Sequence, residues 1–241
     1  MRGVHIALRR QAKLTARQVV SQLDRYQKAA PAKPSSTTVA TDISEQLDFP
    51  ELLALETLLA EQALAAYQDG VTAAADQISV AVALEDVHQQ AQDYAEKRAA
   101  ELVGKKKIGG RWVTNPNPKF AITESTRDMV RSEIVEGLEA GLPNAEIGTR
   151  IMQLGAFSSS RALMIARTET AFADVAGNMA TYRESGVVTH KRWITDDDPC
   201  PICETNGDQG VIGLNEDFEN GSDAPPAHPN CECDVEPIVR E

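Results

Sequence analysis

Residues 196–207 read DDDPCPICETNG, and they contain two of the four cysteines in this chain of 241 residues. The other two cysteines lie in APPAHPNCEC, at residues 224–233. The two residues between Cys200 and Cys203 let both thiolates reach one metal ion, while amide groups of the turn donate to the sulfur atoms. The loop 204–227 has too little apolar content to fold unaided, so it needs a cross-link. These cysteines therefore decide how the C-terminal part folds.

A tetrahedral zinc ion would need two further ligands, and three candidates follow in HPNCEC. His228 and Cys231 have the i, i+3 spacing that converges on one side of a turn. Cys231 and Cys233 would point the same way in an extended segment. We expect a structural zinc site made by Cys200, Cys203, His228 and Cys231, with Cys233 as the substitute ligand.

Other uses of the cysteines stay open. MRGVHIALRRQAKL at the N-terminus is not a signal peptide, so we expect synthesis in the cytosol, where thiols stay reduced. Disulfides would need later oxidation, and free thiols are the remaining option. A redox C-x-x-C usually opens a helix in a βαβ setting, which Pro201 and the acidic flanks oppose. We interpret Asp196, Asp197 and Asp198 as a solvated loop, because three carboxylates beside a thiolate–zinc centre would repel it.

The rest of the chain predicts helices. Alanine supplies much of the 42% apolar content and aromatic residues only 5%, which favours close-packed helices. After residue 186, VVTHKRWIT alternates and is β-branched, so it predicts a strand, and little helix signal follows it. The expected fold class is mainly α, with a small C-terminal α+β module resembling a zinc knuckle. The helices are expected at about 49–68, 71–103 (separated by Asp69-Gly70), 123–140, 144–154 and 160–184.

The segment GKKKIGGRWVTNPNPKF, residues 104–120, cannot be one regular helix because of its glycines, prolines and asparagines. Ile108, Trp112 and Val113 predict a short extended piece. Three consecutive lysines could bind phosphate, but at a helix end they more often complement the helix dipole, and we expect the second role.

Charge is unevenly divided along the chain. The net charge is −12, yet residues 1–33 hold eight lysines and arginines and one acid, so they carry +7 and the remainder −19. Residues 4–30 predict an amphipathic helix, and AAPAKPSSTT predicts a linker. The expected domains are a basic arm at 1–33, a linker at 34–41, a helical body at 42–186 and a Cys/His module at 187–241. The arm is expected to contact an anionic surface.

Two further interpretations are disfavoured. A helix-turn-helix over 145–184 would place Arg161 and Arg167 on its second helix, but Glu169 and Asp174 share that helix. A plain antiparallel pair is expected instead. No apolar run approaches the length of a membrane span, so we expect no membrane association.

A family resemblance emerges from these motifs. ARTETAFADVAGNMATYRESGVVTHKRWITDDDPCPIC, residues 166–203, followed by PPAHPNCEC, residues 225–233, resembles the head-morphogenesis domain of tailed bacteriophages. This is the group of the phage Mu F protein and the SPP1 minor head protein. ITESTRDMVRSEIVEGLEAGLPNAEIGTRI upstream is also similar, so the resemblance covers roughly residues 85–238. Family members often have Arg or Lys between the last two cysteines, where this chain has Glu232.

The resemblance implies a minor capsid protein without enzymatic activity, made in the host cytoplasm. It implies a place in the virion, in the capsid interior or at the portal vertex, and a role in head assembly, genome packaging or ejection. The expected partners are the portal protein, a scaffolding or major capsid protein, and packaged DNA through residues 1–33. Within the A-R-T-E motif, Arg167 and Glu169 are expected to tie their helix to the terminal module.

Two rival classes remain. In a treble-clef metal-dependent nuclease, or a DNA-binding protein of that type, His228 and Asn230 would be the candidate functional residues. Such a nuclease needs a general-base histidine beside a metal-binding histidine or asparagine, and this region has a single histidine. A toxin or effector is the third class, because this domain can be fused to toxins; we expect no further catalytic domain after residue 241, which disfavours this class.

Overall fold

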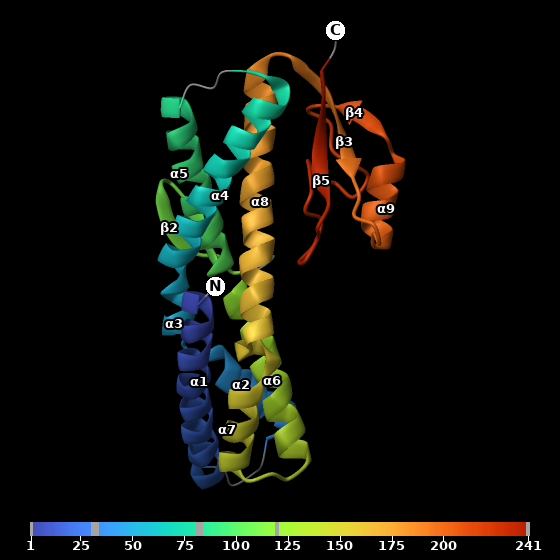
Figure 1. Cartoon of the computed structure of the whole chain (residues 1–241). Helices are drawn as coiled ribbons and strands as arrows, with labels where there is room; N and C mark the ends of the chain where they lie inside the picture. The colour runs from blue at the N-terminus through green and yellow to red at the C-terminus, as the bar shows by residue number, and fades with distance from the viewer. Residues whose placement is uncertain (1, 30–33, 81–83, 119–120, 240–241) are drawn as a thin grey trace. The chain divides into compact units, whose positions relative to one another are not determined.

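The fold is mainly helical with a small strand module at the C-terminus, as expected (Figure 1). The computed structural model describes residues 2–29, 34–80, 84–118 and 121–239. In chain order the helices are α1 (Arg2–Ala29), α2 (Ser36–Glu45), α3 (Pro50–Leu53), α4 (Leu55–Ile78), α5 (Leu84–Leu102), α6 (Ile122–Glu139), α7 (Asn144–Gln153), the 3-10 turn η1 (Gly155–Phe157), α8 (Ser159–Ser185) and α9 (Pro201–Asp208). The strands are β1 (Lys105–Ile108), β2 (Arg111–Thr114), β3 (Val188–Ile194), β4 (Val211–Gly213) and β5 (Asp234–Val239).

The chain divides into two compact units. Unit 1 comprises residues 1–58 and 99–163, and unit 2 comprises residues 59–98 and 164–241. Because α4, α5 and α8 contribute to both units, this division does not follow the order of the sequence. The domain limits expected from composition remain a prediction.

Helix α1 belongs to unit 1. Val4, Leu8, Val19 and Leu23, which have helical spacing in the sequence, are all buried. They face a core to which α3 and α7 contribute, and α1 and α7 approach closely. A side-chain carbon added at Gly148 of α7 would lie 2.6 Å from a methyl group of Val20. The predicted amphipathic helix is therefore confirmed, and its apolar side is covered within unit 1.

Part of the expected linker is helical. Residues 30–33 lie outside the described residues, but Ser36–Glu45 form α2. Ser35 caps this helix, since its hydroxyl oxygen accepts a hydrogen bond from the amide of Thr38 at 3.1 Å. Ser and Thr at the start of a helix resemble a flexible Ser/Thr run in sequence, which explains the difference.

The expected break at Asp69-Gly70 is wrong. Helix α4 continues without a break through Asp69 and Gly70. Within unit 2, helix α8 crosses α4 at this position. A side-chain carbon at Gly70 would lie 2.0 Å from the carbonyl oxygen of Asp174, and one at Gly177 would lie 2.2 Å from the carbonyl oxygen of Tyr67. Both glycines thus permit close packing of two helix backbones. Buried Ala173 of α8 packs in the same cluster as Tyr67 and Val71 of α4.

The expected extended piece after residue 104 is confirmed, but the lysines have a different place. Helix α5 ends at Leu102, and Lys105–Ile108 form strand β1, which pairs antiparallel with β2. The lysines therefore lie along a strand, and the expectation that they complement a helix dipole is wrong. The tight Gly109-Gly110 turn makes a hairpin more favourable than an extension of α5.

Helices α6, α7 and α8 lie close to their expected positions. Thr123 lies inside α6, whose N-cap is Ala121, and Asn144 lies just inside α7, after Pro143. At the start of α8, Arg161 donates to the hydroxyl oxygen of Ser125 at 2.7 Å. Arg161 is therefore engaged within unit 1, which disfavours the helix-turn-helix interpretation further.

The C-terminal strands form a sheet with the order β4-β3-β5, antiparallel throughout. The predicted strand VVTHKRWIT is its central strand, β3. One face of β3 carries Trp193, which packs edge-on against Phe218 with ring centroids 5.0 Å apart. Helix α9 was not expected; it begins with Pro201, which is well suited to the first turn of a helix.

Candidate metal centre

The structure brings all five predicted ligand residues together. Cys200 is the N-cap residue of α9 and Cys203 lies in its first turn. His228, Cys231 and Cys233 lie in the segment that leads into β5. Trp193, Ile212 and Phe218 pack beside the sulfur atoms, so the strands supply an apolar wall on which the two cysteine-bearing segments meet.

The donor atoms lie at least as close together as ligand atoms on one metal ion. The Nε2 atom of His228 lies 3.1 Å from the Sγ atom of Cys200 and 3.4 Å from that of Cys203, and the Sγ atoms of Cys203 and Cys231 are 3.6 Å apart. Ligand atoms on a tetrahedral zinc ion are separated by about 3.5–3.8 Å, given zinc–sulfur bonds of about 2.3 Å and zinc–nitrogen bonds of about 2.0 Å. The cluster could therefore bind a metal ion.

Cys203 is shared by two groups of potential ligands. Cys200, Cys203 and His228 form one group, and Cys203, Cys231 and Cys233 form the other, each with its donor atoms within 4.8 Å of one another. The sequence leaves open whether His228 or Cys233 is the spare residue. Both groups in the structure contain Cys203, so it is the ligand that the two share.

The orientation of His228 suits a ligand. Its Nδ1 atom lies 2.9 Å from the carbonyl oxygen of Pro229, which can only accept a hydrogen bond. Nδ1 therefore carries the proton of the neutral ring, and the lone pair of Nε2 points to the sulfur atoms of Cys200 and Cys203. A hydrogen bond from the second ring nitrogen to a carbonyl is the usual support for a metal-bound histidine.

The electrostatics of the thiols are uneven. Backbone hydrogen bonding, chiefly from Cys203, lowers the pKa of Cys200. Burial raises the pKa of Cys203 and of Cys231. Without a cation, the buried thiols stay neutral; a bound metal ion would hold them as thiolates.

A buried lysine and an arginine share one carboxylate in the C-terminal module. The side chain of Lys191 is fully buried on the β3 face that carries Trp193, and its Nζ atom bonds to Asp223 Oδ1 at 2.6 Å. Arg183 holds the other carboxylate oxygen at 2.6 Å. Sequence reasoning missed this pair, although Lys191 lies two residues before Trp193 and so shares its face of the strand.

Residues of the A-R-T-E motif act differently from the expectation. Glu169 pairs with Arg98 of α5, with Nε and Oε2 2.6 Å apart, and Arg167 is exposed. The tie to the terminal module comes from Thr168, whose hydroxyl oxygen accepts a hydrogen bond from the amide of Asn230 at 3.0 Å. Asn230 has a φ of +59°, which asparagine tolerates better than most residues. The motif therefore fixes the loop between His228 and Cys231.

The three aspartates before Cys200 are exposed, in agreement with a solvated loop. Among the described residues, they are not part of either potential metal group. Asp196 accepts a hydrogen bond from the amide of Asp197 at 2.8 Å, which shapes the loop.

Residues 128–236 match the family model described as Phage Mu protein F like protein. Over this segment the chain is similar to the phage Mu F-like proteins. The resemblance seen in the sequence motifs is thus confirmed over a segment that contains both cysteine pairs and His228. No curated protein and no solved structure matched the chain.

The match supports a general role in phage head morphogenesis. The matched family consists of structural proteins of the phage head. It implies other phage head proteins as partners and a place in the virion. Helices α1 to α5 and the β1–β2 hairpin lie outside the matched segment. Within the part of the chain that the structure describes, no helix is long and apolar enough to cross a membrane.

Proposed function

We propose that this Mu F-like protein is a minor head protein that associates with the portal vertex and aids head assembly, genome packaging or ejection. The family match over residues 128–236, which includes the whole Cys/His cluster, carries the proposal. The role is architectural: the C-terminal module is held together by its ligands and presents surfaces to other head proteins, without catalysis.

The cluster is proposed to hold one structural zinc ion. Sulfur and imidazole donors are the set that zinc prefers, and the distances around Cys203 fit tetrahedral coordination. A bound ion would cross-link α9 to the segment before β5 and so close the polar loop between them. Cys200, Cys203, His228 and Cys231 are the proposed ligands, with Cys233 as the substitute.

The zinc proposal is tested by elemental analysis of reduced, purified protein, which should contain about one zinc per chain. Cys203→Ser should lose the metal and lower the thermal midpoint. Comparison of His228→Ala with Cys233→Ser identifies the fourth ligand, because only the variant that lacks a ligand loses zinc. Four thiols that titrate freely in native, metal-free protein would exclude the site.

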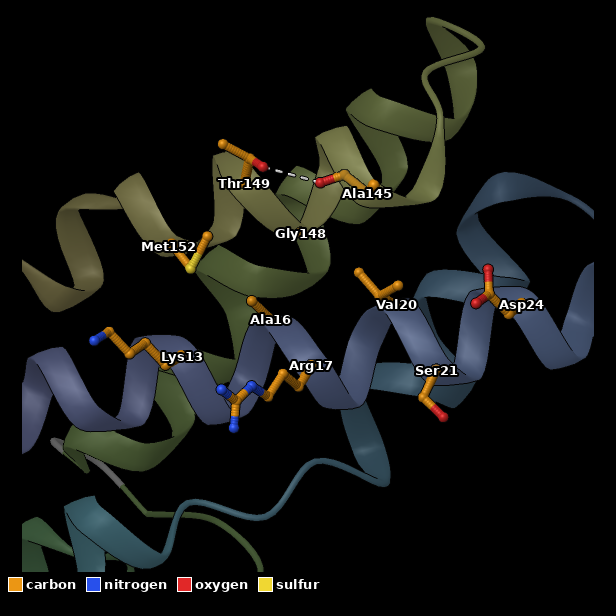
Figure 2. Close-up of a pocket in the computed structure, with 10 residues that line it drawn as sticks. All are labelled: Lys13, Ala16, Arg17, Val20, Ser21, Asp24, Ala145, Gly148, Thr149 and Met152. Carbon is orange, nitrogen blue, oxygen red and sulfur yellow. Dashed lines mark hydrogen bonds between the residues drawn. The ribbon is translucent and has the colours of Figure 1, made fainter.

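Helix α1 is proposed to contact the portal. Figure 2 shows a groove between α1 and α7, with Lys13 and Arg17 on one side and Met152 on the other. The cavity has a volume of about 690 Å³, and its floor includes Ala16 and Val20. Exposed cations beside an apolar floor favour an acidic segment of a folded partner over bare DNA, because a groove of this size between two helices admits a single protein segment but not a duplex.

The contact is tested by co-purification of the full chain with the portal protein of the same phage. Lys13→Glu/Arg17→Glu should weaken the association at least tenfold, since both charges would then repel an acidic partner. The control is Lys97→Glu/Arg167→Glu, which changes the net charge by the same amount at exposed positions of unit 2. This variant should leave the association with the portal protein intact. Equal loss in both variants, or DNA binding by α1 without portal binding, would contradict the assignment.

A further inference from the structure

The β1–β2 hairpin has no role in the proposed function. It lies outside the matched family segment, and the metal centre does not involve it. β1 and β2 pair with each other, and among the described residues no other helix or strand packs extensively on them. A two-stranded hairpin on its own is only marginally stable in water, so one that stands alone suggests a surface kept for binding.

The turn of the hairpin is tight and narrow. Ile108 pairs with Arg111 across a two-residue loop, Gly109-Gly110, with φ values of +57° and +78°. Both glycines adopt the left-handed conformation that this tight turn requires, and added side-chain carbons would meet nothing within 4 Å. The tip is therefore a thin ribbon with free space around it.

The two faces of the ribbon differ. Residues that are paired across the strands share a face, and the pairs are Lys106–Val113, Ile108–Arg111, Lys105–Thr114 and Lys107–Trp112. The first two pairs form what we call the Ile108 face. On the opposite face, Lys105 forms an ion pair with Glu56, and Lys107 lies over the ring of Trp112 at 5.4 Å. The cations of that face are thus already engaged.

The Ile108 face combines free cations with exposed apolar groups. Ile108 is 57% exposed and Val113 38% exposed. Lys106 and Arg111 have no ion-pair partner in the part of the chain that the structure describes. Residues 102–123 contain five lysines and arginines and no acid, although the whole chain has a charge of −12. This local excess of positive charge is not needed for folding.

We propose that the Ile108 face of the hairpin binds duplex DNA. Lys106 and Arg111 contact phosphate oxygens, and Ile108 and Val113 make apolar contacts with sugars or base edges in a groove. The major groove of DNA admits a two-stranded ribbon, and apolar side chains between basic ones are typical of proteins that wedge into grooves. The site needs neither the portal contact of α1 nor the metal centre.

The proposal is tested with the full chain and a short duplex, by measuring the dissociation constant over a series of salt concentrations. Each phosphate contact adds about 0.9 to the slope of log affinity against log salt. Lys106→Thr and Arg111→Thr should each reduce the slope by about 1, and the double substitution by about 2. Threonine keeps the preference for a strand, so the hairpin is retained.

Lys107→Thr is the matched control, because it removes the same charge from the opposite face of the same strand. Lys107→Thr should change the slope of log affinity against log salt by less than half as much as Lys106→Thr does. Ile108→Ser should weaken binding about three- to tenfold at an unchanged slope, because it removes an apolar contact and no charge. Circular dichroism verifies that each variant stays folded.

Three results would overturn the proposal. The first is no binding to duplex DNA by the unmodified chain, which would leave an acidic protein as the partner. The second is equal effects of Lys106→Thr and Lys107→Thr, which would show only non-specific attraction of charge. The third is tighter binding to single-stranded DNA of the same length. The portal co-purification is a separate measurement, so either proposal can fail alone.

Discussion

Substitution of Gly177 by alanine should destabilise the protein, although alanine is the better helix former. Relative to glycine, alanine favours a helix interior by about 1 kcal/mol. Against this, the new side-chain carbon would lie 2.2 Å from the carbonyl oxygen of Tyr67 and 2.9 Å from the amide nitrogen of Val71. These atoms belong to the backbone of α4 and cannot rotate away, so the two helices must separate.

The size of the effect follows from that separation. An ordinary contact needs at least 3.4 Å, so the α4 and α8 backbones must move apart by about 1 Å at the crossing. Gaps then open around buried Ala66, Tyr67 and Ala173, at a cost of about 3–5 kcal/mol. After the gain in helix propensity, Gly177→Ala should lower the free energy of unfolding by about 2–4 kcal/mol. For a chain of this size the thermal midpoint falls by roughly 5–15 °C.

The assay is urea or thermal unfolding followed by circular dichroism, with Gly155→Ala as the control. Gly155 has only the Cε atom of Met129 nearby, at 3.6 Å, so alanine there should change stability by less than about 1 kcal/mol. Gly70→Ala should act like Gly177→Ala, and the double variant should lose less than the sum, because one separation relieves both clashes. A Gly177→Ala protein as stable as the control would refute close packing of the two backbones.

Three further predictions concern unit 2. Asp223→Asn should lower stability at pH 7 by about 1–3 kcal/mol, because it leaves buried Lys191 without its counter-ion while Asp223 itself is 43% exposed. Burial opposes ionisation of Asp223, but Lys191 and Arg183 outweigh it and hold its pKa below the usual value. The stabilisation is therefore complete above about pH 4 and is lost as pH falls through the lowered pKa, so unfolding curves of the two proteins should converge there. Glu169→Gln should cost about 1–3 kcal/mol in chemical denaturation, since Arg98 loses a largely buried partner, whereas the exposed Arg167→Gln should be neutral. Finally, the protein should not nick plasmid DNA with Mg²⁺, Mn²⁺ or Zn²⁺, because Nε2 of His228 faces sulfur atoms; nicking that disappears in folded His228→Ala would show a catalytic site.

Features that depend on local spacing could be predicted from the sequence. The helical repeat of Val4, Leu8, Val19 and Leu23 predicts the buried side of α1, and alternation in VVTHKRWIT predicts β3. The C-x-x-C pair and HPNCEC predict which residues meet at the cluster, because metal ligands have characteristic spacings. These signals are strong since each follows from the geometry of one short segment.

Features that depend on a neighbour distant in sequence could not be predicted and became evident in the folded protein. Gly70 looks like a helix break until Asp174 of α8 is seen against it, and the role of a helical glycine depends on what approaches it. Lys191 is buried because Asp223, 32 residues later, supplies the opposite charge. Whether His228 or Cys233 completes the metal site also depends on loop geometry, because each lies in a group with the shared Cys203. Local sequence encodes the preference of each residue, but burial and pairing are decided by contacts that form only when the chain is folded.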